Sequence, residues 1–520
     1  MKAQRTRREF LADVSRGMVT AAVGFEVAHG LGLSSAVAEE ASDALTFGEL
    51  EPLVCFMQET PVDKLLPGLV EKLKSGTELS RLLAAAGLAN ARTFGGEDYV
   101  GFHTMMALAP AFHMAQELPK ELQPLPVFKV LYRNTNRIQE RGGRKNEVLK
   151  MVKPQPLPES GIGGEALREA VRQMEAPKAE ALFAALSKRT AEDAFNDLLY
   201  AVHDQTEVHR VVLPYRAWDL LGLIGKNQAH TLLRQSVRYC VKAESWAQKY
   251  AGNEPRILLP NILEEYKLLA RTPGDRRAED KWIDELCQTF FKSSPQEAAR
   301  AAAAALAEGF APSDIGEAIS LAANQLVLRD HGRTPREESL GKPPGSVHGD
   351  SIGVHASDSA NAWRSMSRVT NPRNCFASII LGAYQVALDR TERGGDFANW
   401  QPLPLPRHVE EVKATDAETL LRQADEAIRA NLQGRVSGIV HRYGELGHAP
   451  RAMFDLFLRY AVSEDGALHA EKFYRTVTEE FTAGRPAFRW RHLVALARVT
   501  ASEYGRPAAG VAEARSLLKV

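Results

Sequence analysis

Apolar side chains recur at intervals of three and four residues through most of the chain after residue 60. Two clear stretches are 65–73 (Leu-Leu-Pro-Gly-Leu-Val-Glu-Lys-Leu) and 452–460 (Ala-Met-Phe-Asp-Leu-Phe-Leu-Arg-Tyr). This spacing places the apolar groups on one face of an α-helix, whereas the alternation that is typical of strands is scarce. Pro- and Gly-rich breaks interrupt the pattern at 154–164, 341–353 and 402–407. We therefore predict an all-α fold.

A turn followed by an Ala- and Leu-rich helix pair recurs four times, starting near Pro61, Pro177, Pro295 and Ala417. The period is roughly 120 residues, and units of this kind bury their apolar faces against their neighbours. The alternative is that Ala- and Leu-rich helices resemble one another by chance. We predict a single large domain, 39–520, of four quasi-equivalent helical-repeat units packed around a central site. The units span about 61–150, 177–290, 295–400 and 415–505.

Each predicted unit carries one histidine at a matching place. It follows the first helix pair, an apolar residue precedes it, and an amphipathic helix continues from it; the four are His103, His209, His355 and His469. If the units pack around a common axis, the four rings converge. Four imidazoles at one centre suit a borderline transition metal such as iron, zinc or copper. A lone histidine on an apolar face is more often a satisfied core residue, but four matched positions favour a metal site.

Lys472 lies three residues after His469, so the two side chains share a face of the predicted helix. A protonated ammonium group cannot bind a metal and repels a cation. Two interpretations stay open. Either the lysine extends to solvent, or burial beside a metal lowers its pKa so that CO₂ carboxylates it. The carboxylated side chain would be an anionic oxygen ligand.

These motifs resemble those of the questin oxidase-like proteins, which are all-helical, internally repetitive oxygenases. Some of them oxidise or cleave polycyclic aromatic compounds. The resemblance covers most of 60–500 through four short segments: His103-Thr-Met-Met-Ala-Leu, His209-Arg-Val-Val-Leu, His355-Ala-Ser-Asp-Ser-Ala-Asn-Ala-Trp-Arg and the His-x-x-Lys of His469-Ala-Glu-Lys472. It implies a non-haem iron held by the four histidines and a carboxylated Lys472. Leu213 departs from the pattern, because the family's second unit often has another histidine there.

Other residues near these histidines are candidates for the same site. His203 and His348 precede two of the four by six and seven residues, so either could replace its neighbour as a ligand. A nearby carboxylate could orient a ligand imidazole by accepting its second N–H, although such residues are more often helix caps or solvated side chains. These carboxylates are Asp204, Glu207, Asp350 and Asp358.

Two aromatic residues follow the predicted ligands by one to two helical turns. Tyr215 follows His209, and Trp363 follows His355. They either line a pocket for an aromatic substrate or pack between helices, and the second role is the commoner one for such residues.

The first 38 residues resemble a twin-arginine export signal. Arg7 and Arg8 precede a weakly apolar stretch, 17–33, and Ala36-Val37-Ala38 provides an A-x-A end. Glu26 and His29 lie inside the apolar stretch, and the alternative is an ordinary amphipathic helix. The resemblance implies export to the periplasm in a folded state, a route common for enzymes that take up a cofactor inside the cell.

Composition narrows the classes of partner. The 520 residues include 65 Lys and Arg and 65 Asp and Glu, so no basic excess favours nucleic acid. Four cysteines, none in a CxxC pair, do not suggest a disulfide framework or a thiolate zinc site. No apolar run reaches the roughly 18 residues of a membrane span. GxxxxGK[ST], HExxH and CxxCH motifs are also missing, as is a GxGxxG after a strand.

The sequence thus favours a non-haem metal-dependent oxygenase. Its iron would be held by four histidines and Lys472, and its substrates would be O₂ and an organic, aromatic small molecule. The first alternative is a zinc-dependent hydrolase that uses the same histidines, since zinc lowers the pKa of bound water. The second is a non-catalytic helical-repeat interaction protein whose aligned histidines are incidental.

Overall fold

The computed structural model describes residues 44–157, 162–249 and 254–520. The described part contains 23 α-helices, α3 to α25, and no strand, which confirms the predicted all-α fold. The predicted export signal lies outside the described residues. No helix in the described ranges is both long and apolar enough to cross a membrane.

The described residues fall into two compact units. The small unit contains residues 44–46 and 149–152, where Ala44 and Lys150 form an isolated antiparallel bridge. The large unit, Phe47–Val148 and Lys153–Val520, contains all the helices of the described part and all the residues discussed below.

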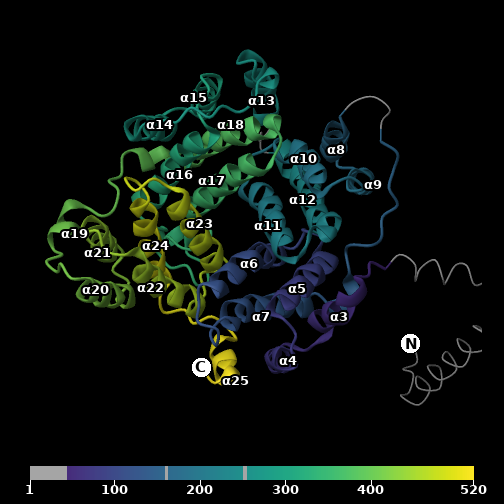
Figure 1. Cartoon of the computed structure of the whole chain (residues 1–520), viewed down its shortest axis with the longest axis horizontal. Helices are drawn as coiled ribbons and strands as arrows, with labels where there is room; N and C mark the ends of the chain where they lie inside the picture. Colours follow the sequence, from purple (N-terminus) through teal and green to yellow (C-terminus); the bar gives the residue numbers. More distant parts are fainter. Residues whose placement is uncertain (1–43, 158–161, 250–253) are drawn as a thin grey trace, which may run out of the picture. The chain divides into compact units, whose positions relative to one another are not determined.

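The helices of the large unit follow one another with short connections (Figure 1). The first group is α3 (Glu51–Glu59), α4 (Val62–Lys74), α5 (Leu79–Phe94), α6 (Tyr99–Gln116) and α7 (Pro124–Glu140). The second is α8 (Gly163–Arg172), α9 (Ala176–Leu186), α10 (Ala191–Val202), α11 (Val208–Ile224) and α12 (Ala229–Lys249). The third is α13 (Glu254–Glu265), α14 (Asp280–Lys292), α15 (Pro295–Ala307), α16 (Pro312–Arg329), α17 (Ile352–Val369) and α18 (Pro372–Asp389). The fourth is α19 (Pro406–Glu410), α20 (Ala417–Arg429), α21 (Gln433–Glu445), α22 (Pro450–Ser463), α23 (Ala470–Ala483), α24 (Trp490–Glu503) and α25 (Val511–Leu518).

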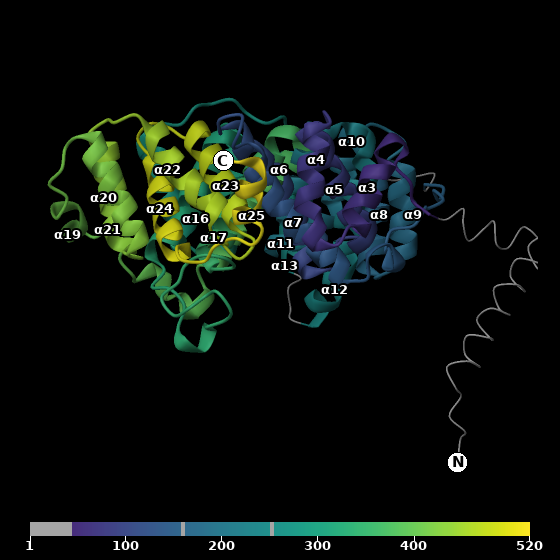
Figure 2. The same cartoon turned by 90° about the horizontal axis from the view of Figure 1, so that it is seen from below.

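Four of these helices form a closed ring. α6 packs on α11, α11 on α17, α17 on α23, and α23 on α6 again. Each comes from a different group, and together they lie near the middle of Figure 1. Figure 2 shows α5, α7 and α11 on one side of the view and α20, α22 and α24 on the other. One helix from each group thus reaches a shared centre, an arrangement compatible with the predicted repeats.

The ring helices differ from the outer ones in how their apolar residues are distributed. In α6, the neighbours Met105, Met106 and Leu108 are all buried, as expected of a helix enclosed on every side. In the outer helix α20 only one face is buried, by Leu420, Ala424, Ala427 and Ile428, whose spacing is that of an amphipathic helix.

Close approach of α16 and α17 depends on a glycine. A Cβ on Gly353 would lie 2.5 Å from the backbone nitrogen of Val327, so no larger residue fits there. This contact fixes the first turn of α17 against α16, two residues before His355.

Two helices that precede the third ring helix in the chain, α13 and α14, pack against the third group. α13 and α14 fall within the predicted second unit, 177–290, but they pack against α15, α16 and α18 of the third group. The sequence period does not mark this packing because both helices are amphipathic and could cover either neighbour.

Candidate metal centre

The four ring helices present their N-terminal ends to one point, and a histidine lies at each. His103, His209 and His355 lie within the first five residues of α6, α11 and α17, and His469 is the N-cap residue of α23. An N-cap side chain fixes three of these ends: Asp98 accepts from Gly101 N, Glu207 from His209 N and Arg210 N, and Ser351 from Val354 N.

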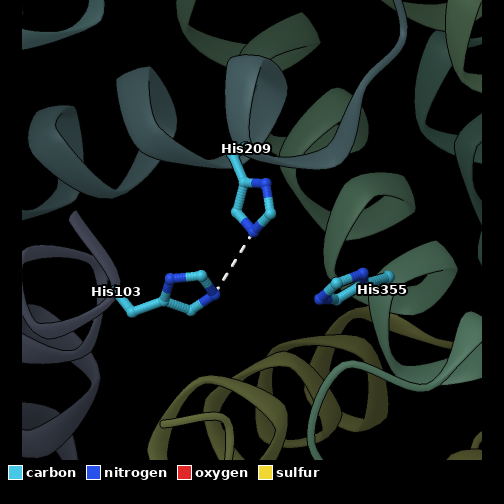
Figure 3. A group of neighbouring side chains, drawn as sticks. All are labelled: His103, His209 and His355. Carbon is cyan, nitrogen blue, oxygen red and sulfur yellow. Dashed lines mark hydrogen bonds between the residues drawn. The ribbon is translucent and has the colours of Figure 1, made fainter. Parts of the chain in front are cut away.

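The four imidazole rings converge. Nε2 of His103 lies 3.2 Å from Nε2 of His209, and Nε2 of His355 lies 3.0 Å from Nε2 of His469. The His103 and His469 ring centroids are 5.1 Å apart, and those of His209 and His355 are 5.5 Å apart. Figure 3 shows the rings of His103, His209 and His355 directed into one space from three helices. The structure therefore brings together all four histidines that the sequence pattern singles out.

Three of the rings are oriented through their other nitrogen. Nδ1 of His103 lies 2.7 Å from the carbonyl oxygen of Tyr99, and Nδ1 of His469 lies 2.7 Å from that of Ala467. Nδ1 of His209 lies 2.6 Å from Oε1 of Glu207. A carbonyl or carboxylate oxygen can only accept, so each Nδ1 donates its proton. The neutral forms of His103 and His469 then present an Nε2 lone pair to the shared space.

Burial favours the neutral form, which a metal requires, in three of the rings. Burial holds the pKa of His103 and His469 well below the ordinary value, and the positive charge of Lys472 adds to the effect. Burial lowers the pKa of His355 to about 3, with His209 and Lys472 as further causes. At 3.0–3.2 Å, two facing Nε2 atoms are joined either by a proton that one ring donates to the other or by a cation that both bind.

The geometry fits a transition metal. Imidazole nitrogens bind such a metal at about 2.0–2.1 Å, so two neighbouring ligand nitrogens lie about 2.9–3.4 Å apart for octahedral or tetrahedral angles. Both Nε2–Nε2 distances fall in that range. The oriented Nδ1 atoms also match the usual support of metal-binding histidines, whose second N–H is held by a carbonyl or carboxylate oxygen.

Lys472 lies beside the cluster and does not extend to solvent. Its side chain is only 2% exposed, and burial lowers its pKa to about 8. Asp358 interacts with it electrostatically, and Asp358 in turn accepts a hydrogen bond from Thr476 Oγ1 at 2.8 Å. A larger fraction of Lys472 is therefore in the neutral amine form than for a lysine in water. The neutral amine is the form that reacts with CO₂.

The two alternative histidines lie outside the cluster. Both ring nitrogens of His348 are occupied, Nδ1 by Ser502 Oγ and Nε2 by the carbonyl oxygen of Gly341, each at 2.8 Å. His203 packs against Trp363, with ring centroids 5.8 Å apart, and its Nδ1 faces Arg373. Neither ring has a contact with the four convergent ones in the described structure, so neither replaces its neighbour.

Of the four candidate carboxylates, Glu207 is the one that holds an imidazole. Asp204 instead pairs with Arg172 at 2.6 Å, and Asp350 pairs with Arg333 and Lys342. These partners come from distant positions, so both carboxylates already have charged partners in the folded chain. Asp358, as described above, faces Lys472 and Thr476.

The two aromatic candidates have structural partners. Trp363 is fully buried, and its Nε1 donates to Gln385 Oε1 at 2.7 Å. Tyr215 donates through its hydroxyl to Glu479 Oε1 at 3.3 Å. Among the described residues, Trp363 stacks on His203 and not on one of the four convergent rings.

Sequence reasoning missed the groups that aim the rings through their backbone. The Tyr99 ring stacks near His103, with centroids 4.3 Å apart, and its carbonyl oxygen orients that imidazole. Ala467 and Leu468 both adopt left-handed backbone conformations, with φ of 51° and 70°, directly before His469. Backbone carbonyls leave no residue-type signal, although an aromatic residue four positions before His103 was visible in the sequence.

A Gly-Asp-Ser-Ile-Gly segment, 349–353, matches the GxSxG pattern of serine hydrolases, but its surroundings differ. Ser351 caps α17, and its hydroxyl donates to the carbonyl oxygen of Val347 at 2.7 Å. The segment follows a loop and not a strand, so it does not form the strand-to-helix turn that activates such a serine.

No protein-family model matches the chain, and no curated protein or solved structure matches it.

Proposed function

We propose that the chain is a metal-dependent oxidoreductase in which His103, His209, His355 and His469 hold a non-haem iron. The proposal rests on one observation: imidazoles from four helices face one space with their Nε2 atoms, while three of their Nδ1 atoms donate to oxygen. Such a ligand set, when loaded with iron, supplies a redox-active centre that can bind and reduce O₂.

The charge at the centre supports a role for Lys472. Four neutral imidazoles give the metal no negative ligand, and the N-terminal ends of four helices add partial positive charge. Carboxylation of the buried Lys472 amine would place a negative group there and balance both. The positive charge of Arg216, which acts on the Lys472 amine, would stabilise this negative group.

The chain's own residues would hold the reactants. Glu207 and the Tyr99 and Ala467 carbonyls keep the ligand rings in place, and His103 and His469 are buried from water. The organic substrate would lie beside the metal and not chelate it, because five protein ligands leave one octahedral position. The electrons for O₂ reduction would come from that substrate or from a partner protein.

Metal analysis of the purified chain tests the proposal. We expect about one iron per chain in the native protein and at least a tenfold loss in each of His103→Ala, His209→Ala, His355→Ala and His469→Ala. His441→Ala is the matched control, because that ring is exposed and pairs with Glu445 at the surface. We further expect the iron-loaded protein to consume O₂ in the presence of electron-rich phenols.

Other outcomes would point to the alternatives. Stoichiometric zinc in place of iron, without O₂ uptake, would favour the hydrolase. Unchanged metal content in all four alanine variants would leave a non-catalytic helical-repeat protein.

Export stays a prediction from residues 1–38. Fusing this segment to a reporter that is active only in the periplasm tests it, with Arg7→Lys and Arg8→Lys together expected to abolish export.

A further inference from the structure

A cavity of about 600 Å³ adjoins the histidine cluster. His355 lines it, and so does Glu207, the carboxylate that orients His209. Its apolar wall includes Val208 and Ile352, the first residues of α11 and α17, together with Leu388. A molecule in this cavity would therefore lie beside the His355 imidazole and beside the carboxylate that orients His209.

The lining of this cavity has a one-sided charge. Among the described residues that line it, four are carboxylic acids and none is a lysine or arginine. Two of the acids are already engaged: Glu207 by His209 and Tyr239, and Glu254 by the hydroxyl of Tyr384 at 2.8 Å. The other two, Asp389 and Glu392, have no hydrogen bond or ion pair with any residue that the structure describes.

The ionised form of Asp389 is destabilised by its surroundings in the cavity. Burial raises the pKa of its carboxyl well above the ordinary value, and the negative charges of Glu392 and Glu207 raise it further. A group that is destabilised by burial and by like charges is stabilised when a cation enters beside it. Because none of the described residues that line the cavity is cationic, a ligand would supply that cation.

A second polar group in the wall also lacks a partner. Gln205 is 7% exposed, and its Nε2 has no hydrogen-bond partner. Buried amide groups nearly always have partners in native structures, and leaving one without a partner is destabilising. A ligand that offers an acceptor oxygen would satisfy this donor.

We propose that this cavity is the substrate site of the metal centre and that the substrate is an organic amine, bound as a cation by Asp389 and Glu392, with a hydrogen-bond acceptor that faces Gln205. The identification of the ligand as the substrate rests on the proposed function. The charge preference of the cavity does not, because it follows from the side chains that line it. The volume has room for an aromatic ring between the ammonium group and His355.

Three probes of equal size separate charge from shape. Tyramine, 4-ethylphenol and 4-hydroxyphenylacetate share a phenol and differ in carrying a positive, neutral or negative end. Binding to the full chain is measured by calorimetry, in the metal-loaded protein and after treatment with a chelator. We expect tyramine to bind at least tenfold more tightly than either of the others in both forms.

The variant Asp389→Asn with Glu392→Gln should remove this preference, reducing the affinity for tyramine at least tenfold while leaving 4-ethylphenol within about twofold. Its iron content should stay at the native level, which separates this result from a failure of the metal site. Asp275→Asn with Glu308→Gln is the matched control, since both carboxylates are exposed and lie outside the cavity. A thermal melt confirms that each variant is folded.

Equal binding of tyramine and 4-ethylphenol would overturn the inference, as would a double variant that keeps the preference. Binding of Ca²⁺ to the native chain, lost in the double variant and without any preference for tyramine, would also overturn it in favour of an inorganic cation. If the histidine variants keep their metal while tyramine is still preferred, the proposed function fails and the amine site stands.

Discussion

Oε1 of Glu207 lies 2.6 Å from Nδ1 of His209, two residues further along the chain, and it also accepts from the His209 backbone nitrogen. One carboxylate therefore both begins α11 and orients the imidazole that the helix presents. Partial burial would raise the pKa of this carboxyl, but His209 and the hydrogen bonds lower it to about 2, so it stays ionised at neutral pH.

Replacing Glu207 by Gln should weaken metal binding by about 10–100-fold, because the neutral amide holds His209 Nδ1–H less strongly. The helix start should also lose up to about 1 kcal/mol. Metal competition with a chromogenic chelator measures the first effect, and urea denaturation measures the second. Asp416→Asn is the control, since Asp416 caps α20 through Thr419 N at 2.8 Å, away from the cluster. Equal metal affinity in both variants would contradict the positioning role.

Lys472 offers a spectroscopic test. With its amine buried and its pKa lowered to about 8, we expect carboxylation in protein equilibrated with ¹³C-labelled bicarbonate at about pH 8. A carbamate resonance should appear in the carbon NMR spectrum of a zinc-loaded, diamagnetic sample. Lys472→Met should abolish it and lower metal affinity at least tenfold. Lys129→Met serves as the comparison, because Lys129 is also buried but pairs with Glu471 at 2.6 Å. A Lys472→Met protein with native metal affinity would exclude the lysine as a ligand.

The convergence of the four histidines was predictable because its signal is local. Each histidine follows an apolar residue at the start of a helix, and the pattern returns in all four groups. The choice between His348 and His355 was not predictable in this way. His348 is excluded as a ligand by Ser502, which lies 154 residues away in the chain and occupies its Nδ1.

The partners of the candidate carboxylates could not be predicted from the sequence either. Asp204 and Glu207 are three residues apart and look equivalent in the sequence. Arg172 from α8 pairs with Asp204, whereas Glu207 has its partners in its own helix and in Tyr239. The cavity carboxylate Asp389 gave no signal at all, because it comes from the end of α18 and meets Glu207 only through tertiary packing. Local patterns therefore identified the four converging histidines, and long-range packing decided their surroundings.

His348 should make folding stability depend on pH. Burial lowers its pKa to about 4 in the folded chain, and the cations Arg506, Arg333 and Lys342 lower it as well, whereas an unfolded histidine titrates near 6.5. Between these two values the unfolded state binds more protons, so stability falls as the pH falls from about 6.5 to about 4. Above about pH 6.5 the contribution is fully present.

We expect this ring alone to reduce the free energy of unfolding by about 2 kcal/mol between pH 7 and pH 5. Urea denaturation of His348→Gln at both values measures it: the loss should be smaller than in the native chain by about that amount. His441→Gln, which alters an exposed ring, should keep the native pH dependence. If His348→Gln loses as much free energy of unfolding between pH 7 and pH 5 as His441→Gln does, His348 has an ordinary pKa in the folded chain.

The backbone before His469 stores strain that serves the site. Ala467 has a φ of 51°, which costs an L-residue about 1–2 kcal/mol and costs glycine nothing. The Ala467 carbonyl orients His469, and its backbone nitrogen is held by Asp465 Oδ1 at 3.1 Å. Ala467→Gly should therefore keep or raise the free energy of unfolding by up to about 1 kcal/mol, whereas glycine in a helix lowers it. The greater freedom of the loop should at the same time weaken metal binding, since His469 is no longer aimed by a single backbone conformation.

Met174→Gly is the matched control, because Met174 has a φ of 57° in the turn between α8 and α9, far along the chain from any of the four histidines. That variant should gain stability without any change in metal affinity, and a similar loss of metal in both would remove the link between the strained turn and the site.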